Sequence, residues 1–151
     1  MKQIQMKIKK PTILFLFSDT GGGHRSAAEA IIEAIHLEFP NTYETKMVDI
    51  FKKYAPLPLN YAPEIYPHLS RYPRMWKIGY EVSDGTKRIR AFYEFMWPYL
   101  RRGAHQLLKE NPVDLLVSVH QLVNIPILRL KPQSSTPFVT VVTDLVSTHS
   151  A

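Results

Sequence analysis

Residues 13–28 read ILFLFSDTGGGHRSAA, an apolar run followed by three glycines and then by residues suited to a helix. The five apolar residues from Ile13 to Phe17 are typical of a strand that is buried on both faces of a parallel sheet. From Ala27 to Ile35 the apolar residues recur at helical spacing. The stretch therefore predicts a strand, a glycine turn and a helix in direct succession.

The glycine turn is typical of a ligand site. Glycine adopts positive φ and lets another molecule come close to the main chain, and the following helix directs unpaired N–H groups at whatever lies over the turn. A P-loop would end in Gly-Lys-Ser or Gly-Lys-Thr, whereas this turn ends in Gly23-His24-Arg25-Ser26. A dinucleotide fingerprint would need a third glycine where Ser26 stands. The sequence therefore argues against a P-loop and leaves a dinucleotide site as a weaker alternative.

The composition is that of one globular domain. The chain has 151 residues, of which 45% are hydrophobic and 21% charged, and it contains no Cys, so disulfides and thiolate chemistry are excluded. Nineteen Lys and Arg against thirteen Asp and Glu give a formal net charge of +6, which favours anionic partners such as a phospholipid surface or a nucleotide. No apolar stretch approaches the roughly eighteen residues of a spanning helix. We therefore expect a domain that lies on a membrane, if it meets one, and does not cross it.

The remaining elements predict a Rossmann-like α/β fold with a mostly parallel sheet flanked by helices. We expect strands over 12–17, 43–50, 113–119 and 138–142, and helices over 26–39 and 122–130. Ligands of such sheets bind beyond the carboxyl ends of the strands. His24, Asp49, His120 and Asp144 each follow a predicted strand end. The sequence therefore predicts that a ligand site lies at this edge of the sheet.

Residues 51–100 form a predicted helical insertion of unusual composition. They hold both tryptophans, seven of the eight tyrosines and many of the prolines. Prolines interrupt residues 57–63, so no long regular element is expected there. Helical spacing over 86–109 predicts a helix with a kink or break at Pro98, followed by a second helix over 101–110.

Two interpretations of this aromatic and basic insertion stay open. Its aromatic residues can form an ordinary helical core. Alternatively, they form a membrane contact surface, because Trp and Tyr favour the headgroup level and Lys or Arg side chains reach past them to anionic headgroups. The residues of this predicted membrane surface are Arg71, Arg74, Trp76, Lys77 and Trp97.

Three motifs carry a resemblance to a known family. Residues 18–27 (SDTGGGHRSA), 118–122 (SVHQL) and 140–145 (TVVTDL) are similar to the amino-terminal region of monogalactosyldiacylglycerol synthases, and the resemblance extends over residues 11–151. The wider group includes bacterial diacylglycerol glucosyltransferases. The resemblance implies a GT-B glycosyltransferase, in which two Rossmann-like domains enclose the active site. Its amino-terminal domain binds the lipid acceptor and touches the membrane, and its carboxy-terminal domain holds a UDP-sugar.

The resemblance also sets expectations for domains and partners. Residues 1–151 correspond to the amino-terminal acceptor domain, and the donor domain is absent, so we expect this chain alone to be inactive. The implied partners are diacylglycerol, an anionic membrane surface and a UDP-sugar bound through the missing domain. No cofactor, metal or nucleic acid is expected. The implied location is cytoplasmic and peripheral, on the inner face of a membrane.

The implied reaction is inverting transfer of a hexose from a UDP-sugar to the free hydroxyl of diacylglycerol. An alcohol is a poor nucleophile, and a positioned general base raises the rate of its attack by about a hundred- to ten-thousand-fold. His24 is the predicted base, because imidazole suits this role and a helix N-terminus favours its neutral form. Asp19 either orients an imidazole or accepts the substrate hydroxyl, or else only caps the turn.

The other predicted site residues bind substrate. Gly21, Gly22 and Gly23 offer backbone contacts near the reacting groups, and His120 and Asp144 either contact substrate or satisfy a neighbouring loop. Two other functions stay open. One is a nucleotide- or NAD-binding module with Asp49 on the ribose. The other is a membrane-docking assembly domain without catalysis.

Overall fold

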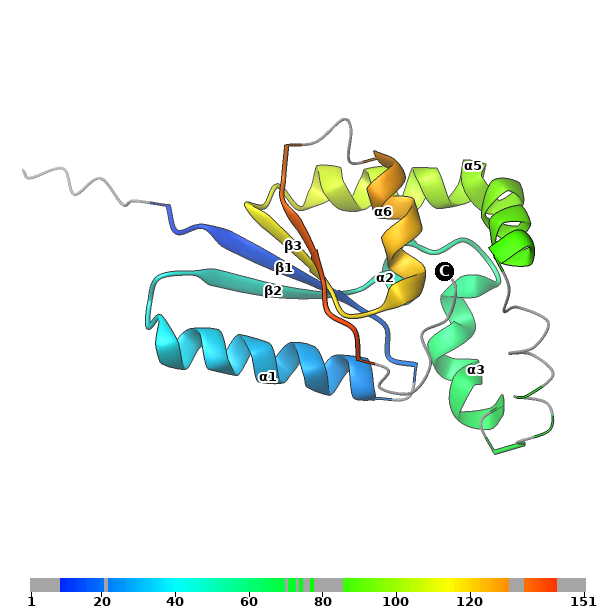
Figure 1. Cartoon of the computed structure of the whole chain (residues 1–151), viewed down its shortest axis with the longest axis horizontal. Coiled ribbons are helices and arrows are strands. Elements are labelled where there is room, and N and C mark those ends of the chain that lie inside the picture. Colours follow the sequence, from blue (N-terminus) through cyan, green and yellow to red (C-terminus); the bar gives the residue numbers. More distant parts are fainter. Residues whose placement is uncertain are drawn as a thin grey trace, which may run out of the picture.

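The structure is a computed structural model that describes residues 9–20, 22–69, 71–72, 74, 77, 86–130 and 135–143 (Figure 1). Strands and helices alternate along the chain, with a helical segment between the second and third strands. The elements are β1 (Thr12–Phe17), α1 (Gly23–Glu38), β2 (Glu44–Asp49), α2 (Ile50–Tyr54), η1 (Leu59–Tyr61), α3 (Ala62–Leu69), α5 (Thr86–Glu110), β3 (Leu115–Ser118), η2 (Gln121–Val123), α6 (Asn124–Leu130) and β4 (Phe138–Thr140).

The four strands form one parallel sheet in the order β2-β1-β3-β4. Strand β1 is central: Phe17 pairs with Asp49 of β2, and Leu16 pairs with Ser118 of β3. The strand order therefore reverses between β1 and β3, and such a switch point is where open α/β sheets bind ligands. This arrangement confirms the predicted Rossmann-like α/β fold, the class expected for the amino-terminal half of a GT-B glycosyltransferase.

Both faces of β1 are covered, which explains its unbroken apolar sequence. Leu14 and Leu16 pack with α5 and α6, whereas Phe15 and Phe17 pack with α1 around Ala28. Figure 1 shows α1 on one side of the sheet and α5 with α6 on the other. Fully burying each such side chain contributes about 1.5–3 kcal/mol, so this strand anchors both layers.

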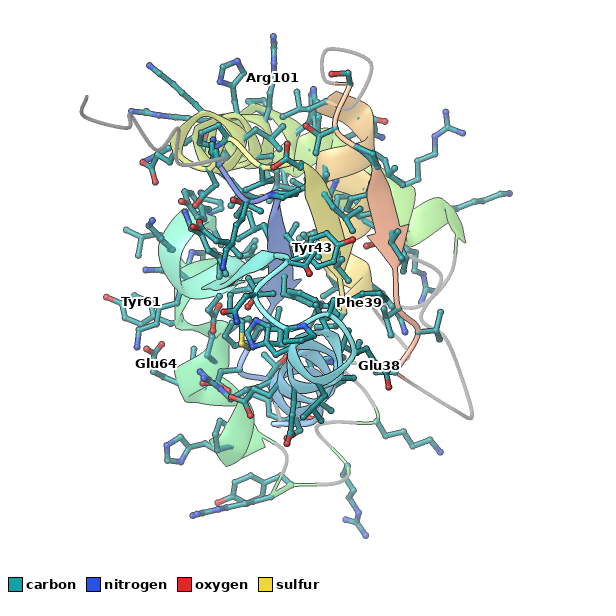
Figure 2. All side chains as sticks on the ribbon, turned by 90° about the vertical axis from the view of Figure 1, so that its left-hand side faces the viewer. Glu38, Phe39, Tyr43, Tyr61, Glu64 and Arg101 are labelled. Atoms are coloured by element: carbon teal, nitrogen blue, oxygen red, sulfur yellow. The ribbon has the colours of Figure 1, made fainter. Side chains whose placement is uncertain are left out.

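The ends of α1 follow from local chemistry. The helix begins at Gly23, three residues earlier than the predicted start, so His24 lies in its first turn. It ends at Glu38, one residue before the predicted end, and Pro40-Asn41 follows; Asn41 has φ 60°, a left-handed conformation that Asn tolerates. The Phe39 and Tyr43 rings then meet edge to face, with centroids 5.9 Å apart, and close the connection to β2 (Figure 2).

Of the kink or break predicted at Pro98, the break is wrong, and so is the separate helix over 101–110. Helix α5 is continuous over 25 residues, with Pro98 on its exposed side. Proline removes one backbone hydrogen bond, but the buried residues on either side, Tyr93 and Leu107, hold the helix against the core. At Gly103 the helix comes so close to α2 that a Cβ would collide with the Tyr54 carbonyl oxygen.

The insertion is helical, as the sequence predicts: its described residues contain α2, η1, α3 and the first part of α5. Trp97 packs against the core cluster below α5, and the Arg129 guanidinium lies 5.0 Å from its ring centroid. The exposed aromatic residues of α5 are instead Phe92, Phe95 and Tyr99. Among the described residues, no helix is long and apolar enough to span a bilayer.

Candidate functional site

The candidate site lies at the carboxyl ends of β1 and β3, where the strand order reverses. Helix α1 brings His24 to this edge, and the chain after β3 brings Val119 and His120. The His24 Nδ1 lies 2.8 Å from the Val119 carbonyl oxygen and 3.0 Å from the Thr143 Oγ1. A carbonyl oxygen only accepts, so Nδ1 carries the proton, and the neutral ring keeps its lone pair on Nε2.

His120 packs directly beside His24. The His24 and His120 ring centroids are 4.4 Å apart at an interplanar angle of 49°. The Phe51 ring meets the His120 ring edge-on, with centroids 5.5 Å apart. His120 is only 7% exposed. Burial, together with the nearby His24, lowers the pKa of His120 to about 3. His120 is therefore neutral at physiological pH.

A hydroxyl group links His120 to the glycine turn. The Thr20 Oγ1 lies 3.2 Å from the His120 Nε2. Within the described part of the chain, the buried His120 Nδ1 has no hydrogen-bond partner, and neither has the buried Ser18 Oγ. Buried polar atoms without partners are uncommon in proteins and call for an explanation. Here they lie at and next to the carboxyl ends of the two central strands.

Asp19 is bound to Arg25. The arginine donates two hydrogen bonds, at 2.9 and 2.7 Å, to the two carboxylate oxygens. This pairing lowers the pKa of Asp19 and raises that of Arg25. The Arg25 guanidinium also lies 4.8 Å from the Phe17 ring centroid. Asp19 therefore holds the turn to the first helix, which fits the structural interpretation left open by the sequence.

The Asp49 carboxylate is hydrogen-bonded to backbone N–H groups. Its carboxylate accepts hydrogen bonds from the Asp19 N–H at 3.1 Å and from the Lys52 N–H at 3.0 Å. It thereby caps α2 and ties the end of β2 to the loop after β1. Both oxygens are occupied in this way, which favours the capping interpretation over a ribose-binding one.

An open pocket of about 450 Å³ lies at this edge of the sheet. One part of its lining is polar and carries imidazole and hydroxyl groups, and the other is hydrocarbon. The lining residues are Thr20, Gly23, His24, Ala27, Tyr66, Val141, Val142 and Thr143. Gly22 has φ 75°, which favours glycine, and an added Cβ on Gly22 or Gly23 would meet no atom within 4 Å. A ligand can therefore approach the backbone of the turn.

The structure brings four of the predicted residues together: Gly22, Gly23, His24 and His120. Gly21, Trp76 and Asp144 lie outside the described residues. The exposed side chains Arg71, Arg74 and Lys77 are elsewhere in the insertion.

Sequence reasoning missed four residues. Thr20 and Phe51 contact His120, Thr143 contacts His24, and Tyr66 lines the pocket. Thr20 and Thr143 each lie just beyond a predicted strand, and this position could have identified them from the sequence.

A Rossmann-like sheet with an imidazole pair and an open pocket at its switch point defines an α/β protein with a ligand site at the carboxyl edge of the sheet. The family model described as Monogalactosyldiacylglycerol (MGDG) synthase matches residues 24–151. The chain belongs to the monogalactosyldiacylglycerol synthase family, which confirms the resemblance drawn from the three motifs.

Curated plant proteins show the same relationship. The chain is 37% identical over 143 residues to probable monogalactosyldiacylglycerol synthase 2, chloroplastic, of Oryza sativa subsp. indica. It is 36% identical over 142 residues to monogalactosyldiacylglycerol synthase 2, chloroplastic, of Arabidopsis thaliana. Each match covers 91% of this chain but only 30% of the relative. No solved structure gives a significant match.

Proposed function

We propose that this chain is the acceptor-binding part of a glycosyltransferase that moves a hexose from a UDP-sugar to the free hydroxyl of diacylglycerol. The observation that carries the proposal is the hydrogen bond from His24 Nδ1 to the Val119 carbonyl oxygen, at 2.8 Å. It fixes the tautomer with a free lone pair on Nε2, in a ring that lines the pocket. Family membership supplies the reaction class.

His24 acts as the general base. The acceptor oxygen forms a bond to the anomeric carbon of the sugar while the bond from that carbon to the UDP oxygen breaks. The hydroxyl proton moves to Nε2 of His24, and the bonding electron pair leaves with UDP. Attack from the face opposite the leaving group inverts the anomeric configuration. A base of this kind raises the reaction rate by about a hundred- to ten-thousand-fold.

The neighbours of His24 suit the imidazolium that this step creates. The proton stays on Nδ1 and is donated to the Val119 carbonyl oxygen throughout, so the ring keeps its orientation. His120 is uncharged at physiological pH, and its ring centroid lies 4.4 Å from that of His24. A charged neighbour at this distance would oppose protonation of the base, and a neutral one does not.

The glycine turn stabilises charge on the leaving diphosphate. Gly22 is the N-cap and Gly23 the first residue of a 16-residue helix, whose unpaired N–H groups and dipole favour anions at this end. Gly21 and Asp144 lie outside the described residues, and substrate contact by these two stays a prediction from the sequence. Asp19 supports the turn through Arg25.

We propose that the donor is bound by a second domain and that the acceptor is taken from a membrane surface. The chain corresponds to about 30% of the length of its relatives, which leaves ample sequence in them for a donor domain. Helix α5 exposes Phe92, Phe95 and Tyr99, whose spacing of three and four residues places them on one face. Aromatic side chains on such a face insert at the headgroup level.

Helix α5 also carries exposed basic residues. Arg101, Arg102 and Lys109 are exposed on the same helix, and Figure 2 shows Arg101 projecting away from the body of the molecule. Together with Arg71, Arg74 and Lys77 they provide charge for an anionic bilayer. The protein is accordingly peripheral. Trp97, which packs inward, supports this helix from below.

The transfer reaction tests the proposal. The complete protein that carries this sequence is incubated with radiolabelled UDP-galactose or UDP-glucose and with vesicles containing diacylglycerol. We expect labelled glycolipid from one of the two donors. Absence of product with both donors, in a protein that binds the vesicles, would contradict the proposed reaction. Residues 1–151 alone should yield no product, because they do not include the proposed donor domain.

A further inference from the structure

Thr20 lies where a side chain of the site can bind substrate. Its hydroxyl oxygen is 3.2 Å from the Nε2 of His120, which is buried and has no partner for its Nδ1 among the described residues. A buried N–H without an acceptor is rarer than an unpaired acceptor. His120 therefore carries its proton on Nε2 and donates it to Thr20.

With this assignment, the hydroxyl hydrogen of Thr20 is not used in the bond to His120. A threonine hydroxyl holds one donor and two acceptor positions, and His120 occupies an acceptor position. No acceptor in the described part of the chain takes the Thr20 proton. Because Thr20 lines the same pocket as His24, the hydroxyl is a donor available to a ligand there.

The pocket combines this donor with an acceptor, with the hydroxyl-bearing residues Tyr66 and Thr143, and with hydrocarbon. The acceptor is the Nε2 lone pair of His24, and Ala27, Val141 and Val142 line an apolar wall. A ligand that fits must supply a hydroxyl, an oxygen that accepts, and an apolar chain. Sugar hydroxyls placed against these three apolar side chains would have no partners there, whereas an acyl chain needs none. A fatty-acyl ester beside a free hydroxyl meets all three demands.

We propose that Thr20, held by His120, donates a hydrogen bond to the ester carbonyl oxygen next to the reacting hydroxyl of the acceptor lipid. The inference rests on the proposed function and adds a specificity-determining contact to it. In 1,2-diacylglycerol the free hydroxyl and one ester are on adjacent carbons, so a single lipid reaches His24 and Thr20 together. Thr20 and His24 line the same pocket, and both contact His120: the His120 Nε2 is 3.2 Å from the Thr20 Oγ1, and its ring centroid is 4.4 Å from that of His24. His120 is the positioning residue of this pair.

This contact predicts discrimination between ester and ether lipids. A dialkylglycerol has the same hydroxyl and chains but no carbonyl oxygen, so it leaves the Thr20 proton unpaired. A single neutral hydrogen bond corresponds to roughly three- to ten-fold in affinity. We expect kcat/KM to be lower by this factor for the dialkylglycerol, mainly through KM, because the bond is present in the ground state.

The experiment measures transfer to dioleoylglycerol and to dioleylglycerol, its diether analogue, in the complete protein. Host vesicles are of ether-linked phosphatidylcholine, so the acceptor is the sole source of ester carbonyls. Thr20→Val should lower kcat/KM more for the ester lipid than for the ether lipid and so abolish the preference for the ester lipid. Thr20→Ser should restore the preference. Thr143→Val, which removes the hydroxyl beside His24, should lower kcat/KM for both acceptor lipids by the same factor.

The outcomes separate this inference from the proposed function. Equal use of the two lipids by the unaltered protein would overturn the Thr20 contact and leave the glycosyl transfer standing. Equal losses for both lipids in Thr20→Val would likewise overturn it, since a structural role alone produces them. Absence of transfer to either lipid would overturn the proposed function and the inference together. The ratio in the unaltered protein needs no variant to fold.

Discussion

The His24 and His120 rings lie with their centroids 4.4 Å apart, and the second of them is buried. The two imidazoles thus have different environments, since His24 lines an open pocket and His120 is buried. A buried neutral imidazole beside an accessible one lets a single proton be taken up at a defined nitrogen. This pairing of environments is the basis of the proposed chemistry.

The buried His120 makes the stability of the fold depend on pH. Its pKa is about 3 when folded and about 6.5 when unfolded, so between these values the unfolded chain binds the extra proton. Stability is therefore full above about pH 6.5 and falls as pH decreases toward 3. Each pH unit in this interval corresponds to about 1.4 kcal/mol of unfolding free energy, so about 2 kcal/mol should be lost between pH 6.5 and 5.

Urea unfolding at pH 7 and pH 5 measures this loss. His120→Phe keeps a ring beside Phe51 but does not titrate, so it should lose less stability than the unaltered protein over the same interval. Carboxylates with lowered pKa, such as Asp19 and Glu110, titrate below this range and leave the comparison intact. An identical loss in both proteins would show that His120 is not the linked group.

Gly103 should be intolerant of even one added carbon. A Cβ there would collide with the Tyr54 carbonyl oxygen, so Gly103→Ala forces α2 and α5 apart. We expect a loss of about 1–3 kcal/mol in unfolding free energy, which exceeds the gain in helix propensity. Gly23→Ala is the matched control, because its Cβ meets no atom within 4 Å. Thermal unfolding compares the two, and equal midpoints would refute the close approach.

The aromatic face of α5 should bind anionic membranes. Phe95 is 78% and Tyr99 59% exposed, so replacing both by Ser removes apolar surface without opening the core. Sedimentation with phosphatidylglycerol vesicles should fall several-fold in this variant, and binding of the unaltered chain should be weaker to phosphatidylcholine and at high salt.

Two further variants locate the surface. Replacing Arg71, Arg74 and Lys77 together by Ser tests the basic part of the insertion and should also weaken binding. Leu37→Ser removes an exposed leucine, 74% accessible, from α1 on the opposite side of the sheet and should have no effect. Equal sedimentation of the Phe95 and Tyr99 double variant with the unaltered protein would remove α5 from the membrane surface.

Much of the fold could be predicted because it depends on local pattern. Residues 13–17 are buried on both faces of the sheet, and a helix follows the glycine turn. The strands are parallel, as their alternation with helices indicated. Pro98 was misread because its cost to the helix is local, whereas the packing that offsets it comes from the sheet and α6.

The site was predictable only in part, for the same physical reason. His24 and His120 follow strands, and strand ends of a parallel sheet meet at one edge. Thr20 and Thr143 take their roles from contacts across the chain: Thr20 meets a residue 100 positions away, and Thr143 one 119 positions away. No periodicity in a single segment encodes such a contact. The core position of Trp97 is another case, since it depends on Arg129 and the helix beneath it.

The measurement that tests the central claim most directly is kcat of His24→Ala in the complete protein with diacylglycerol vesicles. Loss of the base should lower kcat by roughly a hundred-fold or more while KM and thermal unfolding change little, and added imidazole should restore part of the rate. A kcat near that of the unaltered protein would contradict the assignment of His24 as the base.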